Sequence, residues 1–184
     1  MTSNIKTLLK CQLVFFYIMI LFISCNKTVQ KKIKVKYEDP EKYYNTLNKS
    51  QNNVTNLILE IKNTETSDES RELITKLKKN IANSLNTYYG IMLNKDDYGL
   101  KNAFLNQMKF YEKQGLKYII QIIDIRQEIE ILENNDLEVL KSLKKEYKEI
   151  NEVLSLKEKE RSEDIEKIKR NYFKKYNISN ESSK

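Results

Sequence analysis

The chain has 184 residues and a formal net charge of +7 at pH 7, with no His, no Trp, one Pro and three Gly. Residues 1–36 contain lysines but no acid, and basic and acidic side chains are equal in number over residues 37–184. The basic character therefore belongs to the N-terminal segment and does not indicate a nucleic-acid partner. High charge, few Gly and Pro, and regular Leu/Ile spacing predict an all-α domain.

The N-terminus has the order of parts of a bacterial lipoprotein signal. Lys6 and Lys10 precede the apolar run 13–23, and Ser24 stands directly before Cys25. The run is too short for the ~20 residues that a transmembrane helix needs. We expect cleavage after Ser24 and acylation of the Cys25 thiol, with palmitate among the attached acyl chains. The alternatives are a cytosolic protein with an apolar N-terminal helix and an uncleaved signal anchor.

Residues 25–38 are predicted to form a lysine-rich tether between the lipid and the domain. Its positive charges repel one another and favour an extended chain. The tether is either a solvated spacer or a second anchor that adheres to anionic lipid, at about 1 kcal/mol for each lysine near the surface. Because Cys11 leaves with the signal and Cys25 carries lipid, the domain is expected to fold by packing alone, without a disulfide.

Two helices are predicted first. Asp39 as N-cap and Pro40 at the first helical position begin one of them, and residues 63–68 form the turn that follows it. Ser67 or Asp68 is expected to cap the second, from about Glu69, which ends at Gly90 or one turn later at Leu93. Their apolar stripes recur every three or four residues: Tyr43, Tyr44, Leu47, Val54, Ile58 and Ile61, then Leu73, Ile74, Leu77, Ile81, Leu85 and Tyr88.

Two longer helices follow the polar loop 94–99. Residues 100–133 are predicted to be helical, although 118–123 is β-branched enough to suggest a strand, and Gly115 is expected to bend the helix. Asp136 caps the last helix, whose leucines alternate by three and four up to Leu154. Its almost wholly charged part beyond Leu156 is expected to extend past the bundle. The sequence thus predicts an antiparallel bundle of about four helices over 39–176 and a flexible tail over 177–184.

The sequence lacks the parts of common active sites. Without His or a free thiol there is no Ser-His or Cys-His nucleophile, and no glycine-rich phosphate loop occurs. Carboxylates alternate with lysines, as in Glu158, Glu160, Glu163 and Glu166, which is typical of a solvated helix face. Asn94, Asp96 and Asp97 lack the spacing of a calcium loop and favour a polar turn. We therefore expect a protein that is not an enzyme and has neither cofactor nor metal.

Two features suggest recognition. The pairs Tyr43–Tyr44 and Tyr88–Tyr89 are each expected to leave one ring outside the core, where tyrosine suits an interface as well as a core edge. The second feature is a C-terminal basic cluster interleaved with Phe173 and Tyr176, which is a candidate contact for a sulfated glycan or an acidic partner, or else a solvated face. Its members are Lys167, Lys169, Arg170, Tyr172, Lys174 and Lys175.

The signal residues Leu21-Phe22-Ile23-Ser24-Cys25, the Asn- and Lys-rich tether and the His-free helical domain resemble the plasmid-encoded surface lipoproteins of Borrelia-type spirochaetes. The resemblance is specific over about the first 35 residues, and beyond them it is only a general similarity of character. It implies an outer-membrane lipoprotein that faces the cell exterior and binds a host protein or glycan, for adhesion or immune evasion. The alternative is an inward-facing or prophage-type envelope lipoprotein with a structural, assembly or exclusion role.

Overall fold

The computed structural model describes residues 35–64, 66–132 and 137–179. The signal peptide, Cys25, most of the tether, the Asp136 cap and the end of the tail lie outside the described residues. The described elements, in chain order, are β1 (Val35–Tyr37), α2 (Pro40–Asn63), α3 (Ser67–Gly90), β2 (Ile91–Leu93), α4 (Leu100–Phe110), the π-helix η1 (Tyr111–Gly115), α5 (Leu116–Ile131) and α6 (Leu137–Tyr176). The predicted all-α bundle with a long C-terminal helix is confirmed.

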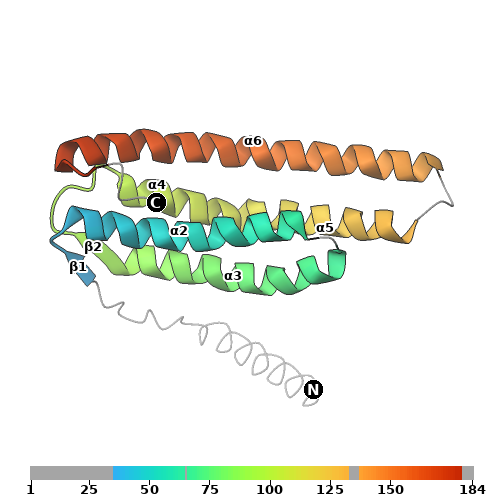
Figure 1. Ribbon diagram of the computed structural model, residues 1–184, viewed down its shortest axis with the longest axis horizontal. Coiled ribbons are helices and arrows are strands. Elements are labelled where there is room, and N and C mark those ends of the chain that lie inside the picture. The colour runs from blue at the N-terminus through green and yellow to red at the C-terminus, as the bar shows by residue number, and fades with distance from the viewer. Residues whose placement is uncertain (1–34, 65, 133–136, 180–184) are drawn as a thin grey trace, which may run out of the picture. The chain divides into compact units, whose positions relative to one another are not determined.

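The helices pack side by side around one core (Figure 1). α2 and α3 form an antiparallel pair, and α4, η1 and α5 continue one another along the bundle. α6 runs back along the side opposite α3 and contacts α4 and α5. The two strands, the start of α2 and the end of α6 meet at one end, which we call the strand end, and the end of α5 and the start of α6 lie at the other.

The start of α2 agrees with the sequence. Asp39 Oδ1 accepts hydrogen bonds from the backbone N–H groups of Glu41, at 2.9 Å, and Lys42, at 3.3 Å, and Pro40 is the first helical residue. These contacts satisfy donors that have no partner within the helix. The prediction of this helix start is confirmed.

The turn between α2 and α3 is shorter than expected, because α2 continues to Asn63 and α3 already begins at Ser67. The N-cap is Thr66, whose hydroxyl accepts from Glu69 N, so the predicted caps Ser67 and Asp68 are wrong. Ser67 instead donates its backbone N–H and its hydroxyl to the Glu130 carboxylate of α5, at 3.1 and 2.7 Å. This long-range contact holds the turn against α5 and accounts for the burial of Ser67.

The last residues of the predicted tether belong to the fold, so the tether prediction is wrong over 35–37. These residues form β1, which pairs in parallel with β2, the segment that follows the end of α3 at Gly90. Tyr37 also packs edge-on against Tyr43 and shares a hydrogen bond with Thr46. The pairing partner lies more than fifty residues away, and an isolated strand of three residues gives no local signal.

Residues 100–131 are helical throughout, so the strand alternative for 118–123 is wrong. The bend expected at Gly115 takes the form of the π-helix η1, whose wider turn inserts one residue into the helical register. A Cβ atom at Gly115 would lie 2.7 Å from Tyr111 Cδ1, closer than carbon atoms approach one another. Glycine is therefore required by the packing of the Tyr111 ring within the turn.

The part of α6 that extends past α2 and α3 is its beginning, which α5 accompanies, so the prediction that the part beyond Leu156 extends past the bundle is wrong. Ile165, Tyr172 and Phe173 are buried in the core. Leu137 is 84 % exposed, and no residue of α6 before Leu154 is buried in the described structure. The α5–α6 hairpin accordingly runs beyond the α2–α3 turn in Figure 1.

The first residues of the predicted flexible tail cap α6. Asn177 has a left-handed backbone, with φ of 52°, and the N–H of Ile178 donates to the carbonyl of Phe173 at 3.1 Å. These are features of a Schellman-type C-terminal cap. Ile178 also packs against the core, so residues 177 and 178 are ordered parts of the fold.

The two tyrosine pairs differ from each other. Tyr88 is buried and Tyr89 is 45 % exposed, as predicted, but Tyr43 and Tyr44 are both buried. Tyr43 donates a hydrogen bond to Asp97 Oδ2 in the loop before α4, and Tyr44 packs edge-on against Phe173 of α6. Neighbouring elements thus cover both rings, because α2 is flanked by the loop on one side and by α6 on the other.

Candidate binding surface at the end of α6

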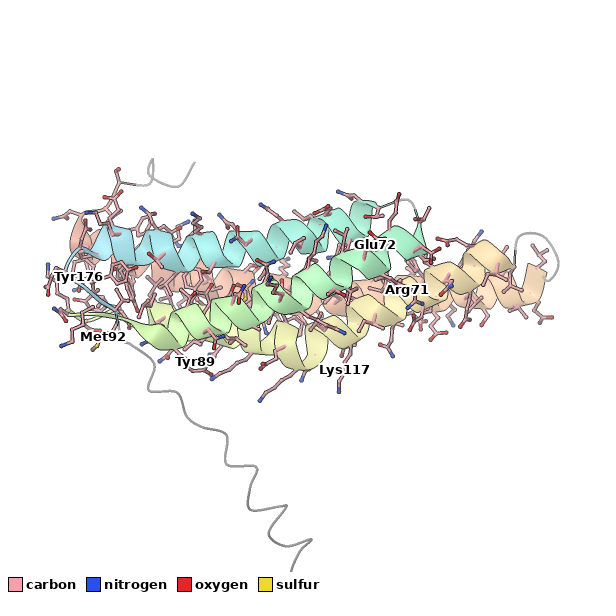
Figure 2. The ribbon with its side chains drawn as sticks, turned by 90° about the horizontal axis from the view of Figure 1, so that it is seen from below. Arg71, Glu72, Tyr89, Met92, Lys117 and Tyr176 are labelled. Atoms are coloured by element: carbon pink, nitrogen blue, oxygen red, sulfur yellow. The ribbon has the colours of Figure 1, made fainter. Side chains whose placement is uncertain are left out.

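Aromatic contacts fix the last turns of α6 at the strand end. The Tyr172 hydroxyl donates to the carbonyl of Pro40 at 2.8 Å, and the Tyr176 hydroxyl donates to the carbonyl of Asp96 at 2.6 Å. The rings of Phe173 and Tyr44 meet edge-on with centroids 4.7 Å apart. Met92 of β2 and Tyr176 lie at this same end in Figure 2. The predicted basic cluster is therefore carried by a helix end with little freedom to shift.

Tyr172 and Phe173 belong to the core and are not a binding platform. Tyr172 is 0 % exposed and Phe173 is also buried. Tyr172 is thus not accessible for the partner contact predicted for it, because Tyr172 and Phe173 both point toward α2. Burial also raises the pKa of Tyr172, so its hydroxyl keeps the proton that it donates to Pro40.

Lys169 is likewise occupied by contacts within the domain. Its side chain is 18 % exposed, and its Nζ lies 3.3 Å from Glu166 Oε1. The same ammonium lies 5.7 Å from the centre of the Tyr44 ring and 5.6 Å from that of Phe173. Burial lowers the pKa of Lys169, but Tyr44 and Glu166 outweigh this effect and the net shift is upward. Lys169 therefore packs α6 onto α2 as a charged group.

The remaining cations of the cluster are exposed. Lys167, Arg170 and Lys174 are spaced by three and four residues, which places them on one face of α6, turned away from buried Ile165 and Tyr172. Lys175 is exposed on the flank of that face. In the described structure none of these four side chains forms an ion pair. We call Lys167, Arg170, Lys174 and Lys175 the basic face.

The nearest acids on α6 do not cancel this charge directly. Glu166 is paired with Lys169, and Glu163 lies 3.9 Å from Lys159. Asp164 borders a different hollow, of about 460 Å³, between α6 and the α4–η1 segment. There the Arg161 guanidinium lies 4.0 Å from the centre of the Phe110 ring. Glu163 lies four residues before Lys167 on the same helical face, but none of the four cations is ion-paired within the described structure, so the basic face keeps a net positive charge.

A second polar cluster crosses the bundle where the sequence suggests only a solvated face. Lys62 Nζ lies 2.9 Å from Glu158 Oε2, and the Tyr111 hydroxyl lies 3.4 Å from Glu158 Oε1. Burial is the main cause that raises the pKa of Tyr111, and the neighbouring Glu158 adds to this rise. Gln107 lies beside this chain of contacts, 2 % exposed, with Oε1 unpaired among the described atoms.

The Lys62–Glu158–Tyr111 cluster connects α2, η1 and α6, so it favours one alignment of these helices along the bundle. Its one sequence signal is the position of Glu158, four residues after the buried Leu154 on the inner side of α6. This signal is hard to recognise in the sequence, because the glutamates near Glu158 lie on other faces of α6 and are exposed to solvent.

The acids of loop 94–99 are used within the fold. Asp96 Oδ1 accepts from the N–H of Tyr98 at 2.8 Å, and Asp97 Oδ1 accepts from the N–H of Gly99 at 3.0 Å. These bonds support the positive φ of Tyr98 and Gly99, so the predicted polar turn is present. Over the described ranges no group of three or more His, Cys, Asp or Glu side chains is placed to hold a metal ion.

Within the described residues no helix has the length and apolar character needed to cross a bilayer. Comparisons with known proteins give no relative from which to transfer a function: no protein-family model, curated protein or solved structure matches this chain.

Proposed function

We propose that this chain is a lipid-anchored outer-membrane lipoprotein, displayed on the cell exterior, whose helical domain is a non-enzymatic binding module for a host protein or glycan. The anchor is the acylated Cys25 that follows the signal-like segment ending at Ser24. The proposal does not depend on any catalytic group.

The observation that carries the proposal is the place where the chain enters the bundle. β1 lies at the strand end, and the α5–α6 hairpin lies at the opposite end (Figure 1). Val35 lies ten positions after Cys25, which limits the distance between their Cα atoms to about 35 Å. A lipid on Cys25 would therefore hold the strand end near the membrane and leave the far half of the domain free to meet a partner.

The experiment that tests the anchor is Cys25→Ala, with Cys11→Ala as the matched control. Both substitutions remove a thiol, but only Cys25 is the proposed acylation site. We expect Cys25→Ala to abolish incorporation of labelled palmitate and membrane association after a high-salt wash, because acyl chains supply the anchoring free energy. Cys11→Ala should retain both. Palmitate labelling or salt-resistant membrane association of the Cys25→Ala protein would refute the proposal.

A further inference from the structure

We infer that the basic face of α6 docks on the anionic headgroups of the membrane that holds Cys25. This inference rests on the proposed lipid anchor and adds a defined orientation of the domain on the lipid surface. Its first support is exposure, since Lys167, Arg170, Lys174 and Lys175 are exposed and form no ion pair within the described structure. Basic residues near an anionic leaflet each favour association by about fivefold.

The second support is position. Tyr172 bonds to Pro40 and Tyr176 to Asp96, so the basic face lies at the strand end, where the chain arrives from Cys25. Cys25 is held within about 35 Å of Val35 by the length of the chain between them. A helix is about 10 Å across, so this length corresponds to about three helix diameters, and a nearly extended segment can reach from β1 across the strand end to the α6 side. The basic face and the point where the chain from Cys25 enters the fold therefore lie at the same end of the domain.

The opposite side of the bundle also carries exposed lysines, and these serve as the reference for a test of orientation. Figure 2 shows that side, with Tyr89 on α3 and Lys117 on α5, whereas α6 is the helix farthest from α3 in Figure 1. Lys78 lies on the same side, beside Ile120 in a shallow hollow between α3 and α5. Docking through α6 would leave these residues facing away from the lipid. The choice of an anionic membrane over a free polyanion follows from the proximity that the anchor imposes.

The test is amine labelling of the lipidated full-length protein in vesicles. The protein is reconstituted in phosphatidylcholine with phosphatidylglycerol, in phosphatidylcholine alone, and in detergent, and lysine labelling rates are measured by mass spectrometry. We expect Lys167, Lys174 and Lys175 to be protected only in the phosphatidylglycerol vesicles, and this protection to disappear at high salt because the charges are then screened. Lys78 and Lys117 should label equally in all three.

A matched pair of double variants checks that charge is the cause. Lys167→Gln with Lys174→Gln should lower the ratio of docked to undocked protein by about 25-fold, seen as lost protection of Lys175. Lys78→Gln with Lys117→Gln removes the same charge from the opposite side and should leave the protection of Lys175 unchanged. Flotation with the vesicles reports the anchor separately, so a failed anchor is distinguished from failed docking.

Several results would overturn the inference. One is a protein that floats with phosphatidylglycerol vesicles while Lys167 and Lys174 label as fast as Lys78 and Lys117. Another is protection that persists in the Lys167→Gln, Lys174→Gln variant. A third is protection of the basic face by heparin in detergent but not by phosphatidylglycerol vesicles, which would assign the face to a soluble polyanion instead.

Discussion

Tyr172 and Lys174 stand two residues apart in α6 and belong to different parts of the protein. The helical turn between them carries Tyr172 into the core, against Pro40, and leaves Lys174 on the exposed basic face. Tyr172→Phe removes one buried hydrogen-bond donor and should lower the free energy of unfolding by about 1 kcal/mol. Lys174→Gln should change it by less than about 0.5 kcal/mol. Urea unfolding of the two variants gives the comparison, and equal losses of stability would contradict the assignment.

Buried tyrosines also predict how stability depends on pH. Burial raises the pKa of Tyr43, Tyr88 and Tyr111 above the ordinary value near 10, and the nearby Asp97 and Glu158 carboxylates add to the shift at Tyr43 and Tyr111. The unfolded state therefore loses these protons at a lower pH than the folded state does. Their contribution to stability is complete below pH about 10 and is lost progressively above it.

This pH dependence is measurable in urea titrations between about pH 8 and about pH 11, with phenolate absorbance recorded alongside. We expect the free energy of unfolding to fall above pH about 10 and the buried phenolates to appear together with loss of the helical signal. Complete tyrosine ionisation near pH 10 in a protein that stays fully helical would show that these rings are not buried as described.

At the scale of the helices, the beginning and the middle of α6 contribute differently to the core. Leu154 is buried and Leu137 is 84 % exposed. Leu154→Asp places an unpaired charge in the core and should cost about 3 kcal/mol or more. Leu137→Asp should cost less than about 0.5 kcal/mol, because that residue stays in solvent. Thermal and urea unfolding followed by circular dichroism give both values, and a larger loss for Leu137→Asp would reverse the placement of the helix.

The π-helix gives a prediction of its own. A methyl group at residue 115 would meet the Tyr111 ring at 2.7 Å, so Gly115→Ala should destabilise the domain by about 1–3 kcal/mol even though alanine favours helices. Gln114→Ala is the control, since Gln114 is exposed beside the same turn. If Gly115→Ala were as stable as the control, the turn would have to close as an ordinary α-helix.

The sequence allows prediction of the apolar face and the first residue of a helix, but not of the elements that pack against it. Asp39 and Pro40 identify the start of α2 because capping involves residues a few positions apart. The strand β1 is not predicted, because its partner, β2, lies far along the chain. The buried face of α6 follows from its spacing, whereas which part extends past the bundle depends on where α2 and α3 end.

The same limit applies to the candidate site. Composition identifies the basic cluster of α6, yet spacing alone does not separate the exposed Lys167, Arg170 and Lys174 from Lys169, which contacts Tyr44 of another helix. The sequence does not predict the Lys62–Glu158–Tyr111 cluster for a related reason. Its members come from three helices, and each looks like an ordinary surface or core residue within its own helix.

At the scale of the whole molecule, the proposed lipid on Cys25 would anchor a bundle whose chain entry and basic face share one end. An anchored domain of this kind leaves α3, α5 and the α5–α6 hairpin for contact with other molecules. This arrangement is useful for binding outside the cell only if the domain lies on the outer side of the envelope. The central claim is therefore that the domain is displayed on the outer side of the membrane.

Protease treatment of intact cells that express the full-length chain tests this claim most directly. We predict that the domain is lost from intact cells, while an internal periplasmic protein survives until the cells are lysed. The Cys25→Ala protein, if retained inside the envelope, serves as the protected control. Survival of the wild-type domain on intact cells, with digestion only after lysis, would contradict surface display and assign the protein an inward-facing role in the envelope.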